Sequence, residues 1–384
     1  MKAGALNRYG WILLLCLTGL TQAATLNITA EYNPANYLEE GAKFINTTPC
    51  TQSLVNWCSG TATVDKPQAI YVSTYTQRAV KDTEDKRFGI HYLSFPPARE
   101  VILTSTTGGG AFPFKFILTD IGSQIIMDNQ NKLQEQGDCI NDKYSWNNVA
   151  TFQFSKIKES MQSSGGVCYS NQNNLSKTVK IASLYLGYKL KTPNPLTMPN
   201  GTYVGRTTFT VGAYKDFDLG GGTYSDNSIT IIFTVKVMHQ IKVEFTTSES
   251  EVELKPPYGW TEWMQTGRVP VYLTGELPYK LWATSTYAAF LKCDNADGLS
   301  CQLKNTQTGH KVRLTVYNMS TLGEQTMLSL AGITKFPVNI DGAGVIGREQ
   351  KVIFKIEKSE LGKILKYPGG TYKGTVTIVF DALL

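Results

Sequence analysis

One stretch of sequence occurs twice in this chain, as PNGTYVGRTTFTV at residues 199–211 and as PGGTYKGTVTIVF at residues 368–380. Pro, Gly, Thr, Tyr, Gly and Thr stand at the same six places in both copies. Each copy continues into the alternation of polar and apolar residues that is typical of a strand. Such a repeat indicates two related domains. Tyr203 and Tyr372 then start the same late strand in each domain, where a tyrosine often pins the corner of an immunoglobulin-like sandwich.

The chain continues differently after each copy of the repeat. The first copy runs on through Gly220–Gly222 into ITIIFTV at residues 229–235, which predicts one further strand, whereas only four residues come after Phe380. We therefore expect the first domain to close its sandwich and the second to lack its final strand. Tyr372, Ile378 and Phe380 would line an open groove that a strand from another molecule fills. A donated strand with about five apolar side chains would contribute on the order of 10 kcal/mol, which is comparable to the stability of a domain.

The composition favours an all-β protein. The chain has 20 Tyr and 34 Gly, and only 18% of its residues are charged, against about 25% in average soluble domains. We predict two tandem immunoglobulin-like β-sandwiches, over residues 24–237 and 241–384, with a short joint at 238–240. Two short helices are expected, at residues 124–136 and 155–162. The predicted strands include residues 26–32, 69–75, 101–106, 112–119, 178–188 and 312–317.

The first 23 residues have the pattern of a secretory signal peptide. Lys2 and Arg8 precede an apolar run from Trp11 to Leu20, and small residues then predict cleavage before Ala24. The apolar run is about half of the ~20 residues that a membrane-spanning helix needs. Without the leader's two cations, the net charge falls from +6 to 6 − 2 = +4. A charge this small and evenly spread does not predict nucleic-acid binding.

The cysteines are expected to form disulfide bonds. The chain has seven, and six remain once Cys16 leaves with the leader. An even number in an exported chain indicates disulfides, although six cysteines allow fifteen connectivities. A zinc site is disfavoured because no CxxC occurs and the three histidines are scattered, so we expect no metal and no cofactor. Proximity in sequence favours the pairs Cys50–Cys58, Cys139–Cys168 and Cys293–Cys301.

Several short stretches together resemble a known family. They are the leader, the strand at residues 27–30, Cys50 and Cys58, the Gly201-Thr-Tyr strand, residues 213–216, the joint at 238–240 and the Gly370-Thr-Tyr strand. The chain is similar in these features to the CfaE/CblD-type minor subunits of alpha-clade (class 5) chaperone–usher fimbriae. That resemblance implies a tip adhesin and assembly initiator, exported through the periplasm to the fimbrial tip at the cell surface.

The resemblance also implies partners. The N-terminal domain would bind a host glycan or surface receptor. The C-terminal pilin domain would engage a periplasmic chaperone and the outer-membrane usher, and would accept the donor strand of a major pilin. Arginines that precede a Tyr-Asp pair in the family are replaced here by Gly212-Ala213, and a further one by the stretch Gly-Ala-Lys-Phe at residues 41–44. The candidate receptor residues are therefore Tyr214, Lys215 and Lys43. The alternative is that Lys215 is a solvated loop charge and Tyr214 a packed strand residue.

Other functions remain as alternatives. The sequence has no GxSxG elbow, HExxH helix or phosphate-binding loop, so we do not expect an enzyme. An exported glycan-acting hydrolase with a triad or carboxylate pair assembled from distant residues stays open. The strand at residues 25–32 alternates and is itself a candidate donor strand, which would make the chain a shaft-linking pilin. A non-adhesive initiator is a further alternative. The aromatic cluster at residues 258–263 fits core packing or docking better than sugar stacking.

Overall fold

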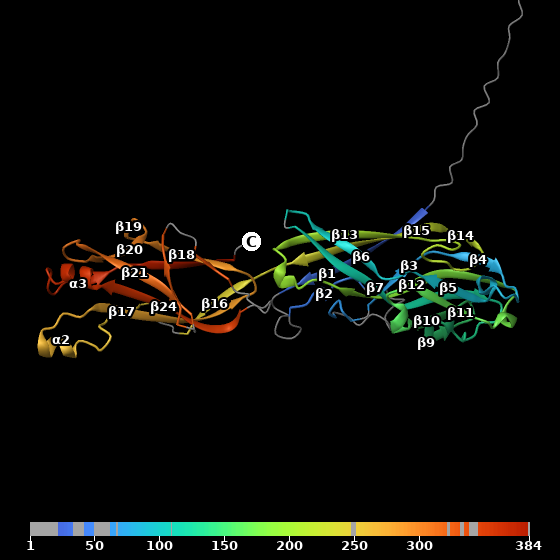
Figure 1. Cartoon of the computed structure of the whole chain (residues 1–384), viewed down its shortest axis with the longest axis horizontal. Helices are drawn as coiled ribbons and strands as arrows, with labels where there is room; N and C mark the ends of the chain where they lie inside the picture. Colours follow the sequence, from blue (N-terminus) through green and yellow to red (C-terminus); the bar gives the residue numbers. More distant parts are fainter. Residues whose placement is uncertain are drawn as a thin grey trace, which may run out of the picture.

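The computed structural model describes residues 22–33, 42–49, 62–66, 68–108, 110–246, 251–320, 323–330, 334–337 and 345–382. The described chain is nearly all β and forms two β-sandwich domains, which lie end to end along the long axis of the molecule (Figure 1). The fold class predicted from the sequence is therefore confirmed. In the described part, no helix is long and apolar enough to cross a membrane.

The first domain contains fifteen strands among the described residues, drawn from blue to yellow-green in Figure 1. They are β1 (Gln22–Tyr32), β2 (Ile45–Asn46), β3 (Gln68–Val72), β4 (Thr76–Ala79), β5 (His91–Phe95), β6 (Arg99–Ser105), β7 (Ala111–Met127), β8 (Gln136–Gly137), β9 (Cys139–Trp146), β10 (Thr151–Ile157), β11 (Gly166–Ser170), β12 (Thr178–Lys191), β13 (Gly201–Thr210), β14 (Thr223–Tyr224) and β15 (Asp226–Val237). Four 3-10 turns accompany them: η3 (Lys86–Phe88), η4 (Glu159–Met161), η5 (Asn173–Leu175) and η6 (Pro195–Thr197).

A large sheet and a small one enclose the core of this domain. The large sheet has the order β14-β4-β12-β7-β6-β13-β15-β1-β2, with β3, β9 and β10 attached beside it, and the small sheet has the order β5-β11-β8. Strand β13 pairs with β6 on one side and antiparallel with β15 on the other, along its whole length from Gly201 to Thr210. Strand β15 in turn pairs in parallel with β1. The strand that carries the first copy of the repeat is thus enclosed on both edges.

The second domain is drawn from yellow through orange to red in Figure 1. Its larger sheet has the order β16-β17-β24-β21-β20-β19, with β22 and β25 attached, and its smaller sheet has the order β23-β18-β26. Its elements are β16 (Ile241–Phe245), α2 (Thr261–Thr266), β17 (Tyr272–Ala283), β18 (Tyr287–Cys293), β19 (Ala296–Asp297), β20 (Ser300–Asn305), β21 (Lys311–Met319), β22 (Gln325–Leu328), β23 (Thr334–Phe336), β24 (Val345–Glu357), α3 (Lys358–Ile364), β25 (Tyr372–Lys373) and β26 (Val376–Ala382).

The joint at residues 238–240 contacts both domains. The Nε2 atom of His239 lies 2.7 Å from the carbonyl oxygen of Met198 in the first domain, and Nδ1 lies 3.2 Å from Oγ1 of Thr284 in the second. The backbone N–H of Gln240 donates to the same Thr284 hydroxyl at 3.2 Å. The polar side chain at the centre of the joint therefore links the domains directly.

The two short helices predicted from the sequence are wrong. Residues 124–127 continue β7, and residues 155–157 belong to β10, so that a single 3-10 turn is the only helical element in either region. Strand β7 pairs with β12 on one side and β10 on the other, and these partners hold Ile125 and Ile126 in extended backbone. Helices α2 and α3, which are each at most seven residues long, are not predicted from the sequence.

Two of the three predicted disulfides are present. Cys139–Cys168 joins β9 of the large sheet to β11 of the small sheet, and Cys293–Cys301 joins β18 to β20 across the two sheets of the second domain. Each bond therefore clips one layer of a sandwich to the other. The predicted pair Cys50–Cys58 and most of the predicted leader lie outside the described residues.

Candidate functional site

The apolar inward-facing side chains of the first copy of the repeat are fully buried. The Tyr203 and Phe209 side chains are 0% exposed and Val211 is 5% exposed. The Tyr203 hydroxyl donates to the carbonyl oxygen of Pro199, four residues upstream, at 2.8 Å. This is the corner-pinning bond expected from the sequence. Strand β15 pairs with the edge of β13 and adds its own buried side chains to the same core.

The second copy has a different environment. Strand β26 pairs with β18 over seven residues and with no other strand of the described chain. Strand β16 lies near β26 without forming a ladder with it. Ile378 and Phe380, which correspond to Phe209 and Val211 of the first copy, are only half-buried. Every second residue of β26 thus directs its backbone N–H and C=O toward an edge that has no strand partner in the described chain.

Tyr372 does not lie on the same strand as Ile378 and Phe380. It belongs to β25, which pairs with β20 of the larger sheet through Tyr372 and Asn305. Its hydroxyl oxygen lies 3.0 Å from Nδ1 of His310, so it lacks the bond to an upstream carbonyl that Tyr203 makes. The chain crosses from the larger sheet to the smaller one between β25 and β26. The Tyr372 side chain therefore anchors β25 in the larger sheet and does not lie on β26.

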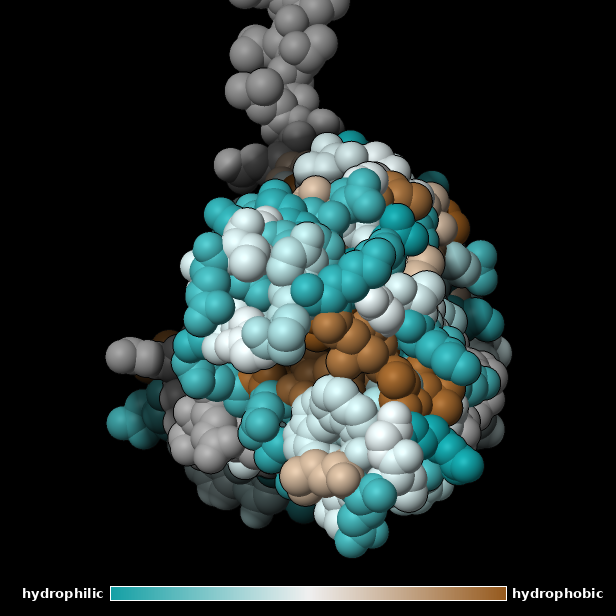
Figure 2. Space-filling model, turned by 90° about the vertical axis from the view of Figure 1, so that its left-hand side faces the viewer, coloured by the Kyte–Doolittle hydropathy of each residue, from teal (hydrophilic) through white to brown (hydrophobic). Residues whose placement is uncertain are grey.

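The cores of the two domains differ in how completely they are covered. In the described part of the first domain, 40 buried side chains form the core and 8 partly buried apolar side chains pack against it. The second core has 17 buried side chains, but 15 partly buried ones pack against it. Figure 2 shows a band of apolar surface, with a hollow, across the end face of the second domain between hydrophilic margins. The second sandwich therefore exposes a much larger share of its core.

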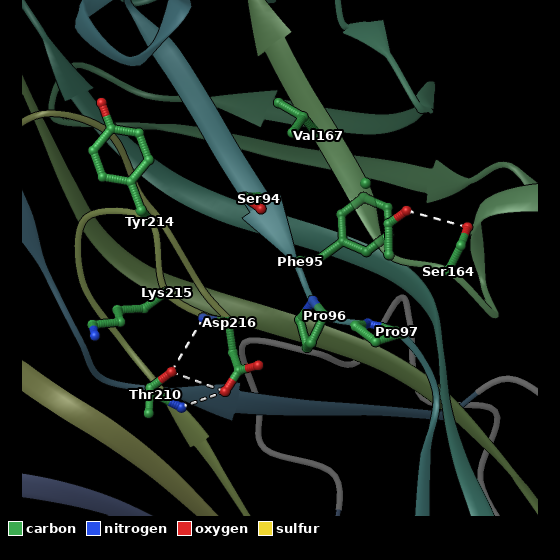
Figure 3. Close-up of a pocket in the computed structure, with 12 residues that line it drawn as sticks. Ser94, Phe95, Pro96, Pro97, Ser164, Val167, Thr210, Tyr214, Lys215 and Asp216 are labelled. Carbon is green, nitrogen blue, oxygen red and sulfur yellow. Dashed lines mark hydrogen bonds between the residues drawn. The ribbon is translucent and has the colours of Figure 1, made fainter.

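A shallow pocket lies in the first domain. It has a volume of about 550 Å³ and is lined by residues 94–97, 164–167, Thr210 and 214–216 (Figure 3). The first group is the end of β5 and the two prolines after it, and the second is the turn before β11 with the first two residues of that strand. The others are the last residue of β13 and the loop that follows it. Two of the three receptor residues predicted from the sequence, Tyr214 and Lys215, are therefore neighbours at one pocket.

Tyr214 has an unusual conformation. Its φ is 60°, and it is the one residue other than glycine with a positive φ in the described part of the chain. The side chain is 79% exposed, and the Arg87 guanidinium carbon lies 3.9 Å from its ring centroid. The Tyr214 N–H and the Arg87 Nε both donate to Oδ2 of the buried Asp218 at 2.8 Å. A strained backbone that holds an aromatic ring in solvent is a feature found at functional sites.

The acidic groups beside the pocket are neutralised. Burial lowers the pKa of Arg87, but the hydrogen bond and charge of Asp218 outweigh this effect and raise it above its ordinary value. Asp216 accepts from Arg99 at 2.6 Å and from the Thr210 backbone N–H at 2.8 Å. Although burial opposes it, these bonds lower the pKa of the Asp216 carboxyl.

Lys215 has a different charge environment from these groups. Its side chain is exposed, and its ammonium has no ion pair among the described residues. Because the carboxyl of its neighbour Asp216 is held by Arg99, the uncompensated charge on the pocket lining is positive.

Lys43 does not join this pocket. Its ammonium pairs with Asp65 at 2.9 Å, and it is not among the lining residues. Lys43 lies two residues before β2. Ile45 of β2 pairs with Glu31 near the end of β1, and Glu31 pairs with Lys236 of β15. The pocket residue Thr210 pairs with Ser228, at the other end of β15. At ~3.4 Å per residue the two positions are about 27 Å apart along this strand.

The structure also contains a group of residues that sequence reasoning could not find. Nε2 of His91 lies 3.3 Å from Oγ of Ser123, and Nδ1 lies 2.6 Å from Oε1 of Glu135. These residues come from β5, β7 and the loop before β8, so no local motif signals them. The Ser123 residue and the Glu135 side chain are both 0% exposed, so a substrate has no access to the serine. The serine, histidine and glutamate contact one another in the same sequence as in a catalytic triad, but they are buried like a polar cluster of the core.

The described residues contain no group of three or more His, Cys, Asp or Glu side chains that fits a metal ion. The bases missed by sequence reasoning are Arg87 and Arg99, which stand on η3 and β6, far along the chain from the loop they support. Only their ion pairs with Asp218 and Asp216, which the fold brings together, identify them as part of the site.

No protein-family model and no curated protein matches the chain. Solved structures do. A chaperone–tip adhesin complex studied for CFA/I fimbriae biogenesis matches with a TM-score of 0.29 and 11% identity, covering 95% of this chain and 98% of that one. The CsuC–CsuE chaperone–tip subunit complex of archaic chaperone–usher Csu pili from Acinetobacter baumannii gives 0.25 and 10%, with 94% and 99% covered. The CupB6 tip adhesin of Pseudomonas aeruginosa gives 0.23 and 12%, with 81% and 94% covered. All three TM-scores lie below 0.5, so the function of this chain has to be argued from its own residues.

Proposed function

We propose that this chain is a fimbrial tip adhesin of the chaperone–usher type. Its second domain, residues 241–384, accepts a strand from another subunit, and its first domain, residues 24–237, binds a receptor on a host surface. The observation that carries the proposal is the environment of β26, whose counterpart β13 is enclosed by β15 in the first domain. We propose no catalytic role.

The first domain provides a template for the missing strand. Strand β15 runs antiparallel to β13, and its Ile229, Ile231, Phe233 and Val235 side chains are at most 2% exposed. A strand with the same alternation, laid antiparallel along the free edge of β26, would cover Ile378 and Phe380 in the same way. At roughly 1.5–3 kcal/mol per buried side chain, four such side chains contribute about 6–12 kcal/mol. This is similar to the total stability of a domain, so the second domain would depend on its partner.

The second domain would meet its partners in a fixed order. An apolar groove of this kind aggregates unless it is covered, so a periplasmic chaperone would cover it first, the outer-membrane usher would receive the complex, and the donor strand of a major pilin would replace the chaperone. The protein would then stand at the fimbrial tip on the cell surface. The resemblance in sequence supports this order, as does the position of the half-buried core residues.

Tyr214 and Lys215 are proposed as the receptor site. The exposed ring, the uncompensated ammonium and the pocket beside them provide stacking and charge for a glycan or a protein receptor. Lys43 is left out of this proposal because its ammonium pairs with Asp65. A non-adhesive initiator is the second candidate, and it is favoured only if cell binding is absent.

The shaft-linking alternative is disfavoured. Strand β1 would have to be free to act as a donor, but it pairs with β15 along all of its residues from Gln22 to Tyr32. Removing it would expose the Ile28 and Tyr32 side chains, which are each 1% exposed. The first domain would therefore lose part of its core.

A peptide experiment tests the groove. The full chain is heated with and without the synthetic peptide NSITIIFTV, which copies residues 227–235. We expect the peptide to raise the unfolding temperature of the second domain, since a ligand at 100 times its dissociation constant stabilises the folded state by about 2.7 kcal/mol. A scrambled peptide is the control. If neither peptide changes the transition, the groove does not accept a strand of this pattern and the proposal fails.

A further inference from the structure

Two aromatic rings are stacked on the surface of the first domain, outside the pocket and the groove. Tyr144 and Trp146 lie at the end of β9 with ring centroids 5.3 Å apart and planes inclined by 7°. They are 43% and 51% exposed. The Lys132 ammonium lies 4.5 Å from the centroid of the Tyr144 ring. The two rings are thus stacked face to face, with a cation over the Tyr144 ring and the indole of Trp146 half-exposed at the end of the strand.

The backbone under the rings is well ordered by hydrogen bonds. Tyr144 pairs with Gln153 and Trp146 with Thr151 in the ladder between β9 and β10. A tight turn follows, in which the Asn147 N–H donates to the Ala150 carbonyl at 3.1 Å. Oδ1 of Asn147 accepts from the backbone N–H groups of Val149 at 2.8 Å and Ala150 at 2.9 Å. Little conformational freedom remains to be lost when a ligand binds to these rings.

The chemistry around the rings fits a sugar. Asn147 and Asn148 are exposed directly beside Trp146. The Asn148 amide provides a donor and an acceptor for hydroxyl groups, and the Asn147 amide, whose Oδ1 is used in the turn, provides a donor. The nearby Asp142 carboxylate is balanced by Lys156 at 3.4 Å. The surface therefore combines a half-exposed indole with a hydrogen-bonding margin, which matches the apolar C–H face and the hydroxyl rim of a pyranose.

The aromatic cluster noticed in the sequence has a different geometry. The Trp260 and Trp263 rings are inclined by 42°, and Trp260 packs partly against the core of the second domain. Its two rings are therefore not stacked in parallel. A protein partner is also a poorer fit for the β9 rings, because a stable protein interface buries about 800 Å² on each side, and Asp142 and Lys143 stand exposed beside them.

We propose that the stacked Tyr144 and Trp146 rings bind a neutral pyranose, with the indole plane against the C–H face of the sugar. This is a second binding site on the first domain, independent of the pocket at Tyr214. It would let the domain contact a neutral sugar unit of a surface glycan whether or not the pocket is the main receptor site.

Saturation-transfer NMR on the full chain tests the proposal, with methyl β-D-galactopyranoside and methyl β-D-glucopyranoside as probes at millimolar concentration. We expect transfer to the ring protons of at least one glycoside, and a loss of affinity of about fivefold or more in Trp146→Ala, since an aromatic contact is worth about 1 kcal/mol beyond its buried area. Tyr75→Ala is the matched control, because Tyr75 is 45% exposed with Lys180 4.6 Å from its centroid but has no stacked ring partner among the described residues.

Lys215→Ala separates this site from the proposed receptor pocket and should leave the NMR signal unchanged. Because the substituted side chains are exposed, each variant should remain folded, and thermal unfolding verifies this. The proposal is overturned if neither glycoside receives saturation, or if Trp146→Ala binds as well as the unaltered chain. Loss of binding in Lys215→Ala with retention in Trp146→Ala would place the sugar in the pocket instead, and would also overturn it.

Discussion

Replacement of Ile378 by aspartate tests the proposed groove most severely. Ile378 pairs with Leu291, which is 2% exposed, and packs against the core of the second domain. Before a partner strand binds, the half-buried position leaves the new carboxylate access to water, so the chain alone should still fold. When a strand covers the groove, that access is lost.

The magnitude is the sum of two contributions. Removing the isoleucine forfeits about 1.5–3 kcal/mol of apolar burial, and covering a polar group without a partner costs at least about 1–3 kcal/mol more. A total of roughly 4 kcal/mol corresponds to a dissociation constant about a thousand times larger, because each 1.4 kcal/mol is tenfold.

The assay is fluorescence anisotropy of the labelled peptide NSITIIFTV with the full chain. The matched control is Thr377→Asp, one residue earlier on the exposed face of β26, which adds the same charge outside the groove and should change the affinity less than tenfold. Equal affinities for Ile378→Asp and the unaltered chain would refute the reasoning, as would equal losses in the two variants.

The contacts around the pocket, the repeat and the joint give three further predictions. Lys215→Ala should reduce adhesion to target cells at least several-fold without changing assembly into fimbriae, because the ammonium has no structural partner in the described chain; equal adhesion would place the receptor elsewhere. Tyr203→Phe should lower the unfolding free energy of the first domain by about 1–2 kcal/mol through loss of the bond to Pro199, measured in urea, with an unchanged midpoint as the contrary result. Burial lowers the pKa of His239 below 6.5, although the Met198 carbonyl opposes it. The unfolded chain then binds this proton more readily, so stability is highest above about pH 6.5 and falls as the pH decreases through that value. His239→Gln should flatten the dependence between about pH 7.5 and about pH 5 in thermal unfolding, and an unflattened curve would contradict the assignment.

Local patterns in the sequence carry much of the fold. The repeat predicts two related domains and the strands β13 and β26, because turn residues and alternation are determined within about a dozen residues. The same local reasoning fails at residues 124–136, where the structure continues β7. Cross-strand partners that lie far away in sequence decide that case, as they often do for strands.

The candidate sites show the same limit. All three receptor candidates rest on the resemblance to the family, and two of them, Tyr214 and Lys215, do line one pocket. Strand register places the third, Lys43, at the far end of β15. Arg87 supports Tyr214 from 127 positions earlier in the chain, and the stacked rings of β9 depend on a strand register that only the fold reveals. Spatial pairing of this kind has no signature in a single sequence.

Hydrogen exchange along β26 in the full chain tests the account most directly. In an antiparallel ladder with β18 alone, every second amide of β26 faces the free edge. Those amides should exchange rapidly while the corresponding amides of β13 are protected, and addition of a partner strand should slow them. Protection of all β26 amides in the chain by itself would mean that its own residues already cover this edge, and would contradict the proposed dependence on another subunit.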